Sequence, residues 1–184
     1  DGVDVILSAR SEDKLQALAR ELVVQHSVKA EVVVSDLSVQ DSAKTLYEAI
    51  KEKGWEVDYL VNNAGFGVFG EFAETKWEDE AAMLNVNVVA LTHLTKLFMP
   101  YFIQRRSGRI MNVASTASFQ PGPLMAAYFA SKAYVLSFSE AISNELKGTG
   151  VTVTALCPGA TETGFQSAAG ATGSRLFETR KLPT

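Results

Sequence analysis

Five short apolar runs, separated by segments of helical periodicity, constrain the fold of this chain more than any other feature. The runs are rich in β-branched residues and almost continuously apolar, as in strands that are covered on both faces. Helical segments of roughly ten or more residues alternate with strands in parallel β-α-β units. The sequence therefore predicts an α/β fold, a doubly wound parallel sheet with helices on both faces. The expected strands are 3–7, 30–34, 57–61, 110–113 and 151–156, and the expected helices are 11–25, 43–50, 77–106 and 127–146.

Length and composition exclude several classes of protein. A chain of 184 residues is long enough for one domain with its own core, so we expect a single domain over residues 1–184. Its net charge of −4 argues against nucleic acid or an anionic membrane as the partner, because either would favour a basic surface. We find no apolar run near the ~20 residues that span a bilayer. The single cysteine, Cys157, fits a cytoplasmic protein.

The histidines give no sign of a metal site. His26 and His93 are not spaced with the cysteine or with carboxylates as metal ligands are. We therefore expect no metal.

Tyr128 and Lys132 lie four residues apart at the start of the predicted helix 127–146. This spacing puts both side chains on one helix face. An ammonium group beside a phenol favours the phenolate and so lowers the tyrosine pKa from its usual ~10. The pair is therefore a candidate proton donor and acceptor for chemistry at a carbonyl or an alcohol.

Three further features stand around this pair in a fixed order. Ser115 lies thirteen residues before Tyr128 and just after the predicted strand 110–113, Asn87 lies in the long helical segment, and Asn-Asn-Ala-Gly (62–65) closes the strand 57–61. Together with Tyr-x-x-x-Lys, these residues resemble the short-chain dehydrogenase/reductase family over residues 1 to about 165. The resemblance implies a Rossmann-like fold. It also implies an oxidoreductase that transfers a hydride between nicotinamide and a ketone, aldehyde or secondary alcohol.

The resemblance also implies roles for the catalytic residues. Tyr128 would be the acid/base, and Lys132 would lower its pKa and bind the nicotinamide ribose. Ser115 would hold the substrate oxygen and stabilise the charge that builds on it. Asn87 would hold a water that relays protons to Lys132. Asn85 is the alternative candidate for this role. It lies two residues away and about 200° around a helix, so the two side chains would face different surroundings.

The same resemblance implies a set of residues that bind the cofactor. Members of the family that prefer NAD carry a carboxylate at the end of the second family strand, where this chain has Ala9 followed by Arg10. A guanidinium binds a 2′-phosphate well, so we expect NADP rather than NAD. The expected cofactor-binding residues are Arg10, Asp36, Leu37, Asn63, Ala64, Gly65, Tyr128, Lys132, Pro158, Gly159, Thr161 and Thr163.

The stretch Gly-Phe-Gly-Val-Phe-Gly (65–70) matches G-x-G-x-x-G but is not expected to bind a dinucleotide. No helix is predicted to open on its last glycine, and Glu71 and Glu74 would turn carboxylates towards a pyrophosphate. In the family the phosphate-binding loop follows a first strand that would precede Asp1. We therefore expect the sequence to be a fragment, with strands 3–7 and 57–61 kept from direct pairing by the place of that first strand.

The resemblance also indicates where a substrate would bind. Loops folded as in the family would place Phe119, Leu124, Met125 and Phe165 along the substrate cleft, and these side chains favour an apolar small molecule. Residues 160–184 lose helical periodicity and are expected to form a substrate or cofactor loop region. The resemblance also implies a homodimer or homotetramer through helices 77–106 and 127–146. Both helices carry more apolar residues than one buried stripe needs, which agrees with such an interface. Phe98, Phe102, Tyr134 and Phe138 are among them.

Two alternative functions stay open at this point. A sugar-nucleotide epimerase or dehydratase would share the tyrosine-lysine pair. A nucleotide-binding protein of the same fold without catalytic activity would share the fold, although such proteins tend to lose Ser115, Tyr128 or Lys132, all of which are present.

Overall fold

The computed structural model describes residues 2–159, and the elements in this part follow the predicted order. Each predicted boundary lies within two residues of the observed one. A π-helical turn, Asn85–Ala90, joins α3 to α4, and a short 3₁₀ helix, Thr116–Phe119, follows β4. The other elements are β1 Val5–Ala9, α1 Glu12–His26, β2 Ala30–Val34, α2 Ser42–Glu52, β3 Tyr59–Asn62, α3 Trp77–Leu84, α4 Leu91–Arg105, β4 Gly108–Val113, α5 Ala126–Glu145 and β5 Val151–Leu156.

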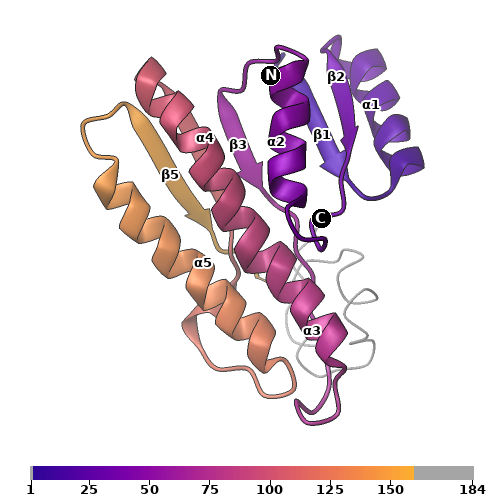
Figure 1. Cartoon of the computed structure of the whole chain (residues 1–184), viewed down its shortest axis with the longest axis vertical. Helices are drawn as coiled ribbons and strands as arrows, with labels where there is room; N and C mark the ends of the chain where they lie inside the picture. The colour runs from indigo at the N-terminus through magenta and orange to yellow at the C-terminus, as the bar shows by residue number, and fades with distance from the viewer. Residues whose placement is uncertain (1, 160–184) are drawn as a thin grey trace.

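The strands of the described part are all parallel and form two sheets (Figure 1). One sheet pairs β1 with β2, and the other has the order β3-β4-β5. No ladder joins β1 to β3. The prediction that these two strands are not direct neighbours is therefore confirmed, and so is the parallel α/β class.

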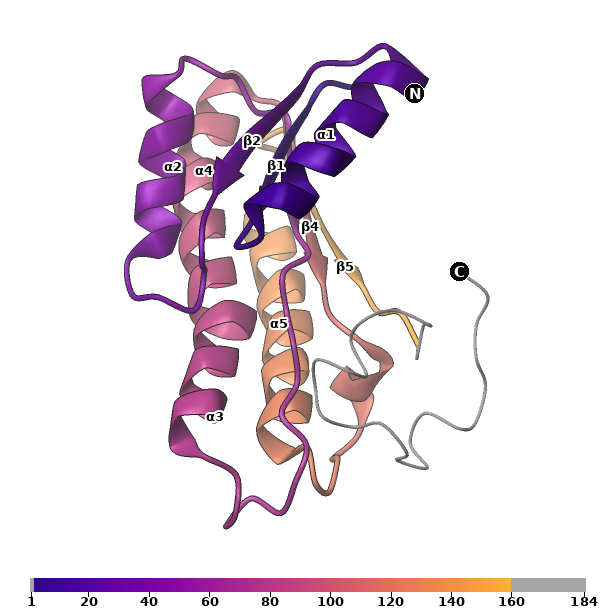
Figure 2. The same cartoon turned by 90° about the vertical axis from the view of Figure 1, so that its right-hand side faces the viewer.

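Helices α2, α4 and α5 lie on one side of the strands, whereas α1 lies on the other side of β1 and β2 (Figure 2). The three-stranded sheet is therefore covered on one face only by the residues that the structure describes. Val61 is 51% exposed and Leu156 is 46% exposed, both on the uncovered face. The expectation of helices on both faces holds for β1 and β2, and for β3-β4-β5 it holds on one face.

The main hydrophobic core lies between α2, α4 and the strands. Phe98 is 3% exposed and Phe102 is fully buried, and the Tyr47 ring meets Phe98 edge-on at 4.9 Å between centroids. Gly108 opens β4 directly against Phe102, where a Cβ would collide with the ring. Phe98 and Phe102 are thus core residues, which corrects their expected place on an oligomer surface: the face of α4 that carries them packs on α2 and β4.

The predicted helix 77–106 is one continuous helical stretch with a π-helical turn in its middle. By length and composition it could cross a membrane, since its most apolar 18-residue window has a mean hydropathy of 1.3, although 44% of that window is buried inside the molecule. The expectation that the chain has no apolar stretch of this length is therefore wrong. A helix that packs into a core needs apolar residues similar to those of a helix in a bilayer, so composition alone does not separate the two. Trp77, at the first position of α3, is 67% exposed.

A set of buried polar side chains ties the sheet to α4 and α5. Asn62 Nδ2 donates to Thr95 Oγ1 at 3.1 Å and to Asn112 Oδ1 at 2.9 Å. Asn112 Nδ2 donates to Ser139 Oγ at 2.9 Å, and the Ser139 hydroxyl donates to the Val135 carbonyl. We call Asn62, Thr95, Asn112 and Ser139 the core network. It satisfies polar groups that would each destabilise the fold by about 1–3 kcal/mol if left unpaired.

Candidate active site

The predicted site residues are brought to one edge because parallel strands end at the same side of a sheet. Ala9 pairs with Val34, and Asn62 with Asn112, so the residues that follow these strands share that edge. A hydrogen bond of 2.9 Å from the Thr116 N–H to the Pro158 carbonyl joins the loops after β4 and β5. The residues brought to this edge are Arg10, Asp36, Asn63, Ala64, Gly65, Ser115, Pro158 and Gly159.

Tyr128 lies in the first turn of α5, with its side chain hydrogen-bonded to that of Ser115. Ser115 also accepts a hydrogen bond from the Ala117 N–H at 3.1 Å, which fixes its side chain at the start of the 3₁₀ helix. Burial raises the pKa of Tyr128, and the hydrogen bond with Ser115 lowers it in part. A raised pKa keeps the phenol protonated at neutral pH, the state that a proton donor needs.

Lys132 is 5% exposed, and its Nζ donates to the Val113 carbonyl at 2.8 Å. Its ammonium lies 5.9 Å from the centroid of the Tyr128 ring. Burial lowers the pKa of Lys132 to about 8, against a smaller opposing effect of the Cys157 charge. The prediction that Lys132 lowers the pKa of Tyr128 has the wrong direction for this structure, because burial dominates at the tyrosine and discourages charge on the lysine as well.

Asn87 lies in the π-helical turn, 1% exposed, and its amide is bonded to backbone and side chain alike. Its Nδ2 donates to the Phe66 carbonyl at 2.9 Å and to Ser131 Oγ at 3.1 Å, and its Oδ1 accepts from the Phe66 N–H at 3.2 Å. The Ser131 hydroxyl donates to the Tyr128 carbonyl at 2.6 Å. We call Phe66, Asn87, Tyr128 and Ser131 the site network.

The choice of Asn87 over Asn85 agrees with this geometry. Asn85 points elsewhere and donates to the Ser38 carbonyl at 3.2 Å. Both amide hydrogens of Asn87 are already used, so its side chain has no donor left for the predicted water relay, which stays a prediction. Ser131 and the Phe66 backbone were not predicted from the sequence. The only available signal was a serine at a helix position next to Lys132.

The residues expected to hold the adenosine half of the cofactor lie at the ends of β1, β2 and β3. Hydrogen bonds from the Ser38 side chain and N–H to Asp36 hold the pKa of this carboxyl below its usual value, and the charge of Arg10 acts in the same direction. Arg10 and Asp36 are therefore close enough to interact. Leu37 is half-buried beside the main core, and Asn63 and Ala64 are exposed.

Gly65 lies close to two of the predicted catalytic residues. A Cβ there would lie 3.0 Å from Asn87 Oδ1 and 3.3 Å from Lys132 Nζ. This edge therefore brings backbone, a carboxylate and cations to the place where parallel α/β sheets bind nucleotides, so the described residues fit a dinucleotide. Thr161 and Thr163 lie outside the described residues.

The residues expected at the substrate differ in their surroundings. Met125 is 3% exposed and packs with Met83, Tyr128 and Phe129, whereas Phe119 is 67% and Leu124 is 43% exposed. Phe165 lies outside the described residues. The stretch 65–70 is a loop with no helix at its end, as predicted, and the Gly70 N–H donates to the Leu124 carbonyl at 2.9 Å.

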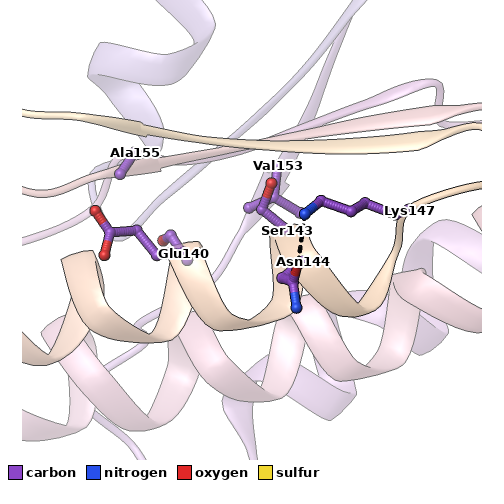
Figure 3. A pocket seen from close by; sticks show the side chains of 7 residues that line it. Glu140, Ser143, Asn144, Lys147, Val153 and Ala155 are labelled. Atoms are coloured by element: carbon purple, nitrogen blue, oxygen red, sulfur yellow. Dashed lines mark hydrogen bonds between the residues drawn. The ribbon is translucent and has the colours of Figure 1, made fainter.

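An open cavity of 250 Å³ lies at the other end of α5, against β5 (Figure 3). It contains none of the predicted site residues, and the Lys147 ammonium in it bonds the Asn144 side chain. We do not assign the chemistry to this cavity. Its lining residues are Ser139, Glu140, Ser143, Asn144, Lys147, Val153 and Ala155.

Comparison with known proteins shows the family and the fold of the chain. The family model described as short chain dehydrogenase matches residues 1–173. The 7beta-hydroxysteroid dehydrogenase of Collinsella aerofaciens is 33% identical over 88% of the chain, and the inactive hydroxysteroid dehydrogenase-like protein 1 of Homo sapiens is 33% identical over 85% of it. A short-chain dehydrogenase from Sphingobium yanoikuyae, solved in complex with NADPH, superposes with a TM-score of 0.88 at 30% identity, over 100% of this chain and 77% of that one.

The chain is shorter than the curated relatives that it matches. It spans 61% of the Collinsella aerofaciens enzyme and 48% of the human protein.

Proposed function

The chain belongs to the short-chain dehydrogenase family, and from that membership we propose that it carries the catalytic centre of an NADP-dependent oxidoreductase. The reaction is hydride transfer between nicotinamide and a ketone, aldehyde or secondary alcohol. One observation carries the proposal: the Tyr128 phenol is hydrogen-bonded to Ser115 beside the buried ammonium of Lys132.

The chemistry of the chain's own residues follows from that arrangement. The nicotinamide, when bound, supplies or accepts the hydride. Tyr128 gives its proton to the carbonyl oxygen in reduction and takes it back in oxidation. Ser115 holds the same oxygen and stabilises the charge that develops on it. Lys132, with a pKa of about 8, is mostly an ammonium at neutral pH and holds the ribose hydroxyls.

Two of the relatives support different parts of this proposal. The solved neighbour holds NADPH, and the Collinsella aerofaciens relative is named as a dehydrogenase of a hydroxysteroid, an apolar secondary alcohol. The human relative is named as inactive, which favours a catalytically silent protein of the same fold as the second candidate. Ser115, Tyr128 and Lys132 are all present in this chain and meet at one site, so we place the enzyme first.

An assay of NADPH consumption tests the proposal directly. The full-length protein is mixed with NADPH and a panel of ketones and aldehydes that includes oxo-steroids, with Ser115→Ala as the matched control. We expect at least one carbonyl compound to be reduced by the wild type, and the control to be slower by about 10²-fold or more, as for loss of an oxyanion donor. NADPH binding without turnover on the whole panel would favour the silent protein.

The cofactor preference has its own test. Ala9 leaves no carboxylate to repel a 2′-phosphate, and Arg10 is exposed at the end of β1, where it can bind one. The double variant Ala9→Asp/Arg10→Ile is expected to move preference from NADP towards NAD. An unchanged ratio of kcat/KM for the two cofactors would contradict the assignment.

We further propose a homodimer or homotetramer in the cytoplasm, built through α3–α4 and α5. Val89 is 55% and Tyr134 is 39% exposed, and the Tyr134 ring stacks on Phe138 at 5.7 Å. These residues form an apolar surface on both helices, which favours a protein partner over nucleic acid or membrane. Sedimentation of the full-length protein as a monomer would contradict this assembly.

A further inference from the structure

Ser131 lies inside α5 between Tyr128 and Lys132, and its hydroxyl makes two hydrogen bonds. It donates to the Tyr128 carbonyl at 2.6 Å and accepts from Asn87 Nδ2 at 3.1 Å, and the residue is 2% exposed. A serine inside a helix commonly bonds only to the carbonyl of the preceding turn. The second bond, to a residue 44 positions away, therefore needs its own explanation.

The direction of these bonds fixes the orientation of the Asn87 amide. A hydroxyl has one proton, and that of Ser131 is used on the Tyr128 carbonyl, so its oxygen accepts from Asn87. The NH₂ group of Asn87 must therefore face Ser131, which leaves Oδ1 facing the Phe66 N–H. If the Asn87 amide were inverted, its oxygen would face the Ser131 oxygen and its NH₂ group would face the Phe66 N–H, so neither hydrogen bond could form.

The backbone held by Asn87 lies directly against the catalytic lysine. A methyl group on Gly65 would lie 3.3 Å from Lys132 Nζ and 3.0 Å from Asn87 Oδ1, so the three groups are in packing range of one another. We propose that Ser131 is a positioning residue, which acts through Asn87 to hold the Gly65–Phe66 backbone against the Lys132 side chain. The inference rests on the proposed function for its kinetic test, but not for its structural test.

The surroundings of Lys132 supply a readout. Its ammonium faces the Val113 carbonyl and the Tyr128 ring, and the other titratable group that acts on it is Cys157. Burial is the larger cause of its lowered pKa. If the Gly65–Phe66 backbone moves away, water reaches the ammonium and its pKa rises towards the value of a free lysine.

Ser139 offers a matched control on the same helix. It is also 2% exposed, its hydroxyl also donates to a carbonyl of the preceding turn, and it also accepts from a buried asparagine, Asn112. Ser131→Ala and Ser139→Ala therefore remove the same two kinds of hydrogen bond. Only the first touches the site network.

The kinetic test compares Ser131→Ala, Ser131→Thr and Ser139→Ala in the full-length protein. For Ser131→Ala we expect kcat to fall by roughly 10- to 100-fold with little change in KM for the carbonyl substrate, since misplacement by an ångström can reduce the rate by ~10²-fold. The alkaline limb of its pH profile should move to higher pH. Ser131→Thr, which keeps the hydroxyl, should restore most of kcat, and Ser139→Ala should match the wild type in kcat and pH profile. Equal losses in the two alanine variants would overturn the inference.

The structural test needs no activity. Amide hydrogen exchange at Phe66, whose N–H is bonded to Asn87 Oδ1, should become about tenfold faster or more in Ser131→Ala after correction for global stability, the factor expected for one lost buried hydrogen bond. It should stay unchanged in Ser139→Ala. Unaltered exchange at Phe66 in Ser131→Ala overturns the inference even if the enzyme is active. Faster exchange in a protein without turnover would support it while the proposed function fails.

Discussion

The two serine–asparagine pairs along α5 make the same hydrogen bonds and serve different parts of the molecule. Ser139 and Asn112 lead to Asn62 and Thr95, all side chains within the sheet and its covering helices. Ser131 and Asn87 lead instead to the backbone of a loop and to the carbonyl of Tyr128. Buried amide networks therefore do not reveal their role by burial or by bond lengths. What lies at the far end of the network decides whether its loss changes stability or rate.

The largest separation of rate from stability is expected at Tyr128. Tyr128→Phe keeps the ring and its packing but removes the proton, and loss of a positioned acid typically lowers the rate by 10²–10⁴-fold. The free energy of unfolding should change by about 1 kcal/mol, the value of the hydrogen bond with Ser115. Steady-state kinetics and urea unfolding of the full-length protein measure the two effects. Near-normal turnover would end the proposed mechanism.

The opposite pattern is expected at Asn112. Asn112→Ala removes the acceptor of one Asn62 N–H and the donor to Ser139 Oγ in a fully buried place, although Asn62 keeps its bond to Thr95 and Ser139 keeps its bond to the Val135 carbonyl. Each buried partner lost destabilises by about 1–3 kcal/mol. We expect unfolding to become easier by roughly 2–5 kcal/mol, with kcat per folded molecule unchanged. A large loss of kcat in protein that is shown to be folded would remove the distinction between the two networks.

Lys132 adds a pH dependence that the core network lacks. Its folded pKa, about 8, lies below its ordinary value of 10.5, so between these values the unfolded chain binds more protons than the folded one. Stability therefore rises with pH across that range, and Lys132→Met removes the rise. From about pH 7 to about pH 9.5, the unfolding free energy of the wild type minus that of Lys132→Met should therefore increase by about 2 kcal/mol. A constant difference would contradict the lowered pKa.

The smallest effect is expected at Thr95. Thr95→Val keeps the shape of a fully buried side chain and removes only the acceptor of one bond from Asn62, which keeps its bond to Asn112. We expect a loss of about 1 kcal/mol in unfolding free energy and no change in kcat or in its pH profile. Any shift of the pH profile would show that the core network reaches the active site.

The order of elements was predictable because apolar periodicity reports burial against a local neighbour. Continuous apolar runs indicated the strands, and the spacing of residues such as Leu94 and Phe98 indicated α4. The same periodicity cannot say which apolar face meets solvent, a second copy or the core. Phe98 and Phe102 were therefore expected on an oligomer surface although both are buried.

The site was predictable to the extent that its chemistry requires particular side chains. Tyr128, Lys132, Ser115 and Asn87 were recognised by type and spacing, and the structure groups Tyr128 with Ser115 and Lys132. The site network was not predictable, because half of its bonds go to the backbone of Phe66, which has the same groups in every residue. The pKa of Tyr128 was predicted in the wrong direction for a related reason: spacing gives proximity, whereas desolvation depends on the packed surroundings.

The π-helical turn of Asn85–Ala90 has a consequence for how this chain can change in length. A π-helical turn is an α-helix that carries an additional residue, so deleting one residue there would restore regular α geometry. The helices α3 and α4 on either side would keep their faces, because the π-helical turn is the part that absorbs the additional residue, whereas the residues inside the turn would be displaced. Asn87 could then no longer face both Phe66 and Ser131. We therefore expect single-residue insertions and deletions to be tolerated at the surface turn 147–150 and eliminated within 85–90, although both segments lie outside the strands.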